Sequence, residues 1–163
     1  MENIKKILVP LEFTEYSQGV FNCAVQVALN SDAELIVLSI INSRDIESVE
    51  SIVAMGYDVN AEHYVEEIRK DRKQQLNAMA DKIQINKDKV KILFKIGKPV
   101  DKILQTIEKE TPDLVVMGTK GRANLKNGVM GSVAGKVFKR SPVNILSHRG
   151  EGVKKSLTKK LQH

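Results

Sequence analysis

Residues 113–133 read DLVVMGTKGRANLKNGVMGSV, and this stretch decides the fold class. Residues 113–117 form a short, valine-rich apolar run, which predicts a buried strand. Glycines follow at positions 118, 121, 128 and 131, and a helical pattern then covers residues 131–139. A strand that leads through a loop into a helix is the repeating unit of α/β proteins. The stretch therefore predicts one such unit, with its loop at the carboxyl end of the strand.

The same alternation extends to both sides of this stretch. The expected strands cover residues 6–11, 35–41, 89–96, 113–117 and 143–147, and the expected helices cover residues 14–30, 63–83, 99–109 and 131–139. We expect Thr14 to cap the first helix. Residues 42–60 are expected to form an irregular connection whose middle could hold a turn of helix. The strand at 89–96 alternates apolar residues with Lys91 and Lys95, which favours the edge of a sheet.

Strands separated by helices predict a parallel sheet that is covered on both faces. We predict a single Rossmann-like α/β domain over residues 1–148, with an open five-stranded parallel sheet in strand order 3-2-1-4-5. Residues 149–163 show no strong core pattern and are expected to form a basic, flexible tail. Ligands of such sheets bind beyond the carboxyl ends of the strands, where the strand order reverses.

Charge and composition narrow the classes of function. The chain has 163 residues and a net charge of +6, of which +4 lies in residues 149–163. This local excess, with only 4% aromatic residues, makes nucleic-acid binding an unfavoured interpretation. No apolar run approaches the roughly 18 residues of a membrane helix, and Cys23, the single cysteine, cannot form an internal disulfide. We expect a cytoplasmic protein without integral membrane contact.

The glycine-rich loop has the features of an anion site. Its spacing is Gly-x2-Gly-x9-Gly-Ser, and residues 120–140 contain six basic residues and no acid. Glycines allow backbone N–H groups to converge on phosphate oxygens, and a helix that begins at Gly131-Ser132 adds unpaired amides. The alternative is that these glycines only end a strand, make a turn and begin a helix. The loop matches neither the Walker spacing nor the dinucleotide fingerprint.

The chain resembles the universal stress protein family. The resemblance rests on Ile7-Leu8-Val9-Pro10-x-acid-x-Thr, Val116-Met117-Gly118-Thr119-x-Gly121, Gly131-Ser132-Val133 and Ser141-Pro142-Val143, and it covers roughly residues 3–148. The Gly-x2-Gly-x9-Gly-Ser element marks the ATP-binding branch of that family. The resemblance implies a five-stranded α/β fold, a homodimer joined largely through the last strands, and bound ATP or AMP. Because the sequence has no cluster with metal-ligand spacing, any Mg²⁺ is expected to be held through the phosphates.

Matched position by position, the resemblance implies a nucleotide site made from three segments. The implied residues are Pro10, Leu11, Glu12 and Thr14 at and just after the end of the first strand, Ile40 at the end of the second, and Met117, Gly118, Lys120, Gly121, Arg122, Gly131, Ser132 and Val133 around the glycine loop. Ile40 would offer backbone groups to the adenine, and Gly131, Ser132 and Val133 would hold the phosphates. Glu12 stands where the family usually has aspartate, so its carboxylate reaches further and the usual contact must be reshaped or lost.

The sequence contains no recognisable catalytic or metal-binding cluster. Glu12 is the one acid near the predicted site, and the three histidines and Cys23 are expected in ordinary structural roles. The leading hypothesis is a stress-response protein that binds ATP or AMP and acts as a regulatory or interaction module with an unidentified protein partner. A slow ATPase or phosphotransferase, and an interaction module that has lost its nucleotide, stay open as alternatives. The basic tail is either solvated or an electrostatic contact.

Overall fold

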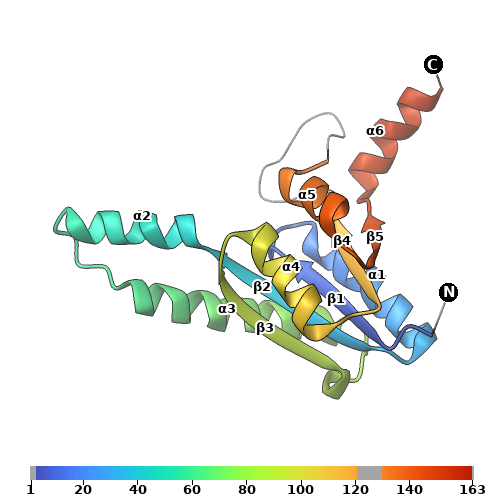
Figure 1. Cartoon of the computed structure of the whole chain (residues 1–163), viewed down its shortest axis with the longest axis horizontal. Coiled ribbons are helices and arrows are strands. Elements are labelled where there is room, and N and C mark those ends of the chain that lie inside the picture. Colours follow the sequence, from blue (N-terminus) through green and yellow to red (C-terminus); the bar gives the residue numbers. More distant parts are fainter. Residues whose placement is uncertain (1–2, 121–129, 163) are drawn as a thin grey trace.

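The computed structural model describes residues 3–120 and 130–162, and within them it forms an open α/β sheet (Figure 1). The elements in chain order are β1 (Lys6–Leu11), α1 (Ser17–Ser31), β2 (Glu34–Asn42), α2 (Ser43–Ala54), α3 (Ala61–Asp81), the short 3₁₀ helix η1 (Lys87–Lys89), β3 (Val90–Gly97), α4 (Pro99–Glu110), β4 (Leu114–Gly118), α5 (Ser132–Arg140), β5 (Asn144–His148) and α6 (Glu151–Leu161).

The sheet has five parallel strands in the order β3-β2-β1-β4-β5, which confirms the predicted fold class and strand order. β1 is central, with Ile7 paired to Leu35 of β2 on one side and to Leu114 of β4 on the other. The lysine-bearing strand β3 lies at one edge, as its alternating pattern predicted. The switch of strand order falls between β1 and β4, so the carboxyl ends of these strands are where a ligand is expected.

Helices cover both faces of the sheet, and the alternation of side chains along each strand divides the core in two. On one face, Ile7 and Val9 pack with residues of α1 and α3, including the fully buried Phe21. On the other face, Leu8 and Leu38 pack with residues of α4 and α5. Because both faces are buried, β1 and β2 are apolar almost throughout, as expected for central parallel strands.

The expected cap at Thr14 is wrong. α1 begins at Ser17, and Tyr16 takes the cap position without a side-chain cap hydrogen bond. Between β1 and α1 the chain makes one more turn, in which the Ser17 N–H donates to the Thr14 carbonyl at 3.0 Å and the Thr14 N–H donates to Ser17 Oγ at 3.0 Å. Phe13 adopts the left-handed region at φ +56° to allow this turn. The sequence did not reveal this turn, because the hydroxyl groups of Thr14 and Ser17 are both suited to the start of a helix.

The expected irregular connection at residues 42–60 is also wrong over most of its length, because α2 occupies Ser43–Ala54. The side chain of Asn42 caps this helix by accepting the Arg44 N–H at 3.1 Å. Ile46, Val49, Ile52 and Val53 recur at the spacing of a helix, a signal that the polar composition of the segment obscured, and of these residues only Val49 is buried. Together with α3, the helix forms a hairpin that projects from the domain (Figure 1).

The tail is helical over α6, where the sequence predicted no regular element. Its one buried residue is Val153, which is 7% exposed. Val153, Leu157 and Leu161 are spaced four residues apart, a helical signal that is easily missed because the residues between them are basic and polar. The division of the chain at residue 148 and the flexibility of the tail stay predictions. No helix within residues 3–120 and 130–162 is long and apolar enough to span a bilayer.

His148 connects β5 to the packing of α1 and α6. Its ring lies so close to Gly19 of α1 that a Cβ at that glycine would be 2.7 Å from His148 Nε2, so a side chain there would displace the ring. Burial lowers the pKa of His148 below its ordinary value of 6.5, the charge of Lys154 lowers it further, and Glu151 partly opposes both. The folded state therefore favours the neutral imidazole, and protonation of His148 destabilises the fold.

The sign of this shift predicts an acid-sensitive fold. The unfolded chain binds the His148 proton more readily, so the contribution of His148 is full above about pH 6.5 and is lost as the pH falls through the lower folded pKa. Chemical unfolding measured from pH 7.5 to 5.5 is expected to show a smaller decrease of stability in His148→Gln than in the wild type. The matched control is His63→Gln, because His63 is exposed and pairs with Glu67. Equal pH slopes for the wild type and His148→Gln would contradict the prediction.

Candidate functional site

One cavity lies at the carboxyl ends of β1, β2 and β4, where the strand order reverses. The structure brings eleven of the thirteen residues predicted from the sequence into its lining: Pro10, Leu11, Glu12, Thr14, Ile40, Met117, Gly118, Lys120, Gly131, Ser132 and Val133. The other two, Gly121 and Arg122, lie outside the described residues. Segments separated by about a hundred residues in sequence therefore meet at one place because parallel strands end at the same edge.

The inner wall of the cavity is apolar. Val20 of α1, Leu38 of β2, Ile103 of α4 and Met117 of β4 all line it, and all four belong to the packed core of the domain. These side chains are held by the sheet and its helices, so the wall is preformed. An apolar wall with a few polar groups is the usual composition of a small-molecule site.

The opposite part of the cavity is suited to an anion. Gly131 occupies the N-cap position of α5 and makes no side-chain cap hydrogen bond, and the first turn of α5 contains no acidic residue. The Gly131 N–H donates to the Thr119 carbonyl at 2.8 Å, which fixes the helix start against the end of β4. The following amides of Ser132 and Val133 have no partner earlier in α5, and Lys120 adds positive charge to the lining.

Gly118 permits the close approach of this loop to α1. A Cβ at this position would lie 3.2 Å from Val20 Cγ2 and 3.4 Å from the Lys120 carbonyl oxygen. The first distance is shorter than most contacts of a side-chain carbon, and the second, to a backbone atom, is at the lower limit of ordinary van der Waals contact. The glycine therefore lets β4 end directly against the cavity without pushing Lys120 or Val20 away.

Arg72 also lines the cavity, although sequence reasoning did not select it. Its Nη1 donates to Ser39 Oγ at 2.8 Å and to the Ile40 carbonyl at 2.9 Å. Its guanidinium lies 5.5 Å from the centre of the Phe13 ring. The available signal was a charged residue within the apolar stripe of the helix at 63–83, a position that normally faces the core. Arg72 thus connects the end of β2 with the loop that follows β1.

The described lining holds few groups that could carry out acid–base or metal chemistry. Glu12 supplies its carboxylate, Lys120 and Arg72 supply positive charge, and neither His63 nor His148 lines it. Among the residues that the structure describes, no group of three or more histidine, cysteine, aspartate or glutamate side chains could hold a metal ion. The geometry favours binding of a molecule with an apolar part and an anionic part.

Comparison with known proteins assigns the fold to a family. A family search matches residues 3–147 to the family described as "Universal stress protein family". The chain belongs to the universal stress protein family. The matched range runs from the residues before β1 to β5, so the family's domain includes all five strands and the cavity. This finding confirms the family resemblance of the sequence.

Individual relatives cover nearly the same part of the chain. Universal stress protein MJ0577 of Methanocaldococcus jannaschii is 26% identical over 150 residues, covering 87% of this chain and 93% of that protein. The solved structure of MJ0577 has a TM-score of 0.70 and covers 91% of this chain and 99% of its own. Universal stress protein UspA from Lactobacillus plantarum has a TM-score of 0.71 at 21% identity, covering 91% of this chain and 100% of its own.

A third solved structure is a universal stress protein in complex with cAMP. It has a TM-score of 0.59 and 20% identity, and it covers 91% of this chain and 98% of its own. At this level of identity the likeness shows the fold alone. The five-stranded sheet and its strand order are therefore shared with solved members of the family.

Proposed function

We propose that this chain binds an adenine nucleotide, ATP or AMP, in the cavity at the ends of β1, β2 and β4. The observation that carries the proposal is the junction of two environments in one cavity: an apolar wall, and the uncapped start of α5 beside Lys120. A nucleoside fits the first environment and a phosphate chain fits the second. The Gly-x2-Gly-x9-Gly-Ser element supports the same assignment.

The proposed roles follow from the position of each segment. Pro10, Leu11 and Thr14 border the nucleoside, Met117 packs beneath it, and Ile40 offers backbone groups to the base. Gly131, Ser132 and Val133 hold the phosphates with amides and a hydroxyl, while Gly118 and Lys120 border the ribose and phosphates. Gly121 and Arg122 are proposed for the same phosphate region from the sequence motif alone. Any Mg²⁺ would be held through the phosphates.

Glu12 is the position at which base recognition is expected to differ from the family pattern. It lines the cavity after β1, where the family usually has aspartate. The extra methylene moves its carboxylate by more than an ångström, since a C–C bond is about 1.5 Å long. We therefore propose that Glu12 contacts the adenosine part in a reshaped geometry and that Glu12→Asp strengthens binding.

We propose that the nucleotide regulates the protein and is not a substrate. Phosphoryl transfer needs a positioned water or base, a metal and a charge clamp at the γ-phosphate. The described lining offers one carboxylate for these tasks, which makes a binding role the better fit.

We further propose that the protein is a cytoplasmic homodimer joined through β5, which lies at an edge of the sheet. An unidentified protein partner would recognise the nucleotide-bound state.

The decisive experiment begins with the protein as purified, without added nucleotide. Denaturation followed by chromatography and mass spectrometry is expected to release ATP or AMP. Titration calorimetry of the emptied protein with ATP, AMP, cAMP and GTP should then give micromolar binding of an adenine nucleotide and weaker binding of GTP. cAMP is included because a family member has been solved with it. The proposal fails if no adenine nucleotide is released and none binds below millimolar concentration.

A further inference from the structure

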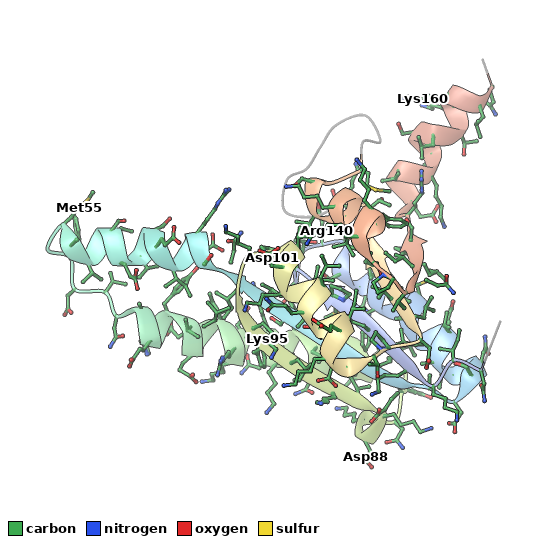
Figure 2. All side chains as sticks on the ribbon, in the orientation of Figure 1. Met55, Asp88, Lys95, Asp101, Arg140 and Lys160 are labelled. Atoms are coloured by element: carbon green, nitrogen blue, oxygen red, sulfur yellow. The ribbon has the colours of Figure 1, made fainter. Side chains whose placement is uncertain are left out.

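The α2–α3 hairpin carries a feature that nucleotide binding does not use. Residues 45–67, called the arm here, include most of α2, the connection to α3 and the first turns of α3. Figure 1 shows the arm extending away from the sheet, and Figure 2 places Met55 at its far end. Every residue from 50 to 60 is exposed. The arm therefore has little of its own domain to pack against.

The tip of the arm is unusually apolar for an exposed segment. Five large apolar side chains in residues 52–59 are exposed: Ile52 (43%), Val53 (41%), Met55 (76%), Tyr57 (65%) and Val59 (41%). They are half of the ten exposed large apolar side chains of the described residues. Scattered exposed apolar residues are normal on a protein surface, but a group of this kind indicates an interaction surface.

The arm is also strongly acidic. It contains seven aspartates and glutamates and no lysine or arginine, so its formal charge is −7, while the other 140 residues carry +13. Two arms would repel each other, which disfavours a symmetric contact of tip with tip. The partner surface must instead be basic and must expose apolar side chains.

α6 offers such a surface within the same chain. It contains Lys154, Lys155, Lys159 and Lys160 against Glu151, a net charge of +3, and its end exposes Leu161 to 86%. Figure 2 places Lys160 at the opposite end of the molecule from Met55, so α6 cannot cover the arm of its own protomer. α2 and α6 have twelve and eleven residues, so each is about 17 Å long and one can lie along the other.

We propose that the arm of one protomer docks along α6 of a second copy of this chain. The contact joins two different surfaces of the chain, so a protomer that is bound through its arm still has a free α6, and association can continue head-to-tail into an open series or a closed ring. Opposite charges attract at long range and are screened by salt, while the apolar tip supplies the contact at close range. This association is separate from the proposed dimer through β5, which has a fixed size.

Sedimentation velocity from micromolar to millimolar concentration, in about 0.05 M and about 0.5 M salt, tests the contact. The wild type is expected to grow in size with concentration at low salt and to lose this growth at high salt. The double variant Met55→Ser/Tyr57→Ser should weaken association more than tenfold, and Lys160→Glu by about two- to fivefold. Glu50→Lys combined with Lys160→Glu should restore part of the loss.

Matched controls separate the contact from general surface effects. Leu29→Ser removes another exposed apolar side chain, and Lys82→Glu makes the same charge change at the end of α3; both should associate like the wild type. Circular dichroism checks that every variant folds. A wild type of the same size at all concentrations and at both salt concentrations overturns the proposal, as does growth that the Met55/Tyr57 variant retains. Loss of association in the arm variants without any effect of Lys160→Glu also overturns it, since α6 is then not the partner.

Discussion

Ser132→Asp is expected to lower the affinity for ATP by about 30- to 150-fold while leaving the fold as stable as before. Ser132 is the first residue of α5, at the start of the helix that we propose binds the phosphates. A carboxylate there would lie close to the phosphates, and repulsion between charges roughly 6–8 Å apart near a protein surface costs about 2–3 kcal/mol. An acidic side chain in the first turn of a helix is itself favourable by about 0.3–1 kcal/mol.

The two effects have opposite signs, which separates loss of binding from loss of folding. Titration calorimetry should show a larger loss for ATP than for AMP, and thermal unfolding without ligand should be unchanged or slightly higher. Ser132→Ala removes only the hydroxyl and should weaken binding about two- to twelvefold, which corresponds to about 0.5–1.5 kcal/mol. Ala61→Asp places the same charge at the first residue of α3 and should leave affinity unchanged. Wild-type affinity in Ser132→Asp would mean that the phosphates do not lie at α5.

The parts of the fold that the sequence predicted are those in which local pattern and burial agree. β1 and β2 are buried on both faces, so their apolar runs were unambiguous, and the lysines of β3 marked an edge strand. α2 and α6 each bury one residue, and their short apolar stripes lie in segments that are otherwise polar, so composition favoured a connection and a tail. α2 depends instead on the cap at Asn42, and such a cap can equally begin a turn.

The candidate site likewise contains residues that the sequence predicted and residues that it did not. Its glycines and the residues at the ends of β1 and β2 follow a motif, and the motif placed eleven residues at one cavity because strand ends converge. Arg72 belongs to no motif and reaches the cavity from α3, so only the packing of that helix on the sheet brings it there. The sequence did not predict the left-handed turn at Phe13, because no glycine marks the position and an aromatic residue rarely adopts a positive φ.

Arg72→Met is expected to lower the free energy of unfolding by about 2–3 kcal/mol and the affinity for ATP by about tenfold. The substitution keeps an apolar stem but removes the donors to Ser39 Oγ and the Ile40 carbonyl. Ser39 is 0% exposed, so its hydroxyl would lose a partner that water does not readily replace, at a cost of about 1–3 kcal/mol. The contact of the guanidinium with the Phe13 ring is lost as well, and such contacts contribute about 0.5–2 kcal/mol.

The effect on affinity follows because Arg72 joins two walls of the cavity. Without the guanidinium, the Ile40 edge and the loop of Glu12–Thr14 are less firmly held, and a site that must be ordered on binding has a lower affinity. Arg69→Met is the matched control, because Arg69 lies one turn earlier on α3 over Phe94 and does not line the cavity; it should leave affinity unchanged. Arg72→Lys keeps the positive charge but lacks the planar guanidinium with its paired N–H donors, so its stability and affinity should lie between those of Arg72→Met and those of the wild type.

A double-mutant cycle with Ser39→Ala isolates the buried hydrogen bond. Removing both partners leaves no orphaned hydroxyl, so Arg72→Met/Ser39→Ala should be more stable than the sum of the two single losses predicts. Urea unfolding of the four proteins, followed by titration with ATP, measures the coupling and its consequence for binding together. Strict additivity, or wild-type affinity in Arg72→Met, would show that Arg72 packs beside the cavity without organising it. A positive coupling that appears in both stability and affinity would show that the same hydrogen bonds hold the sheet edge and shape the nucleotide site.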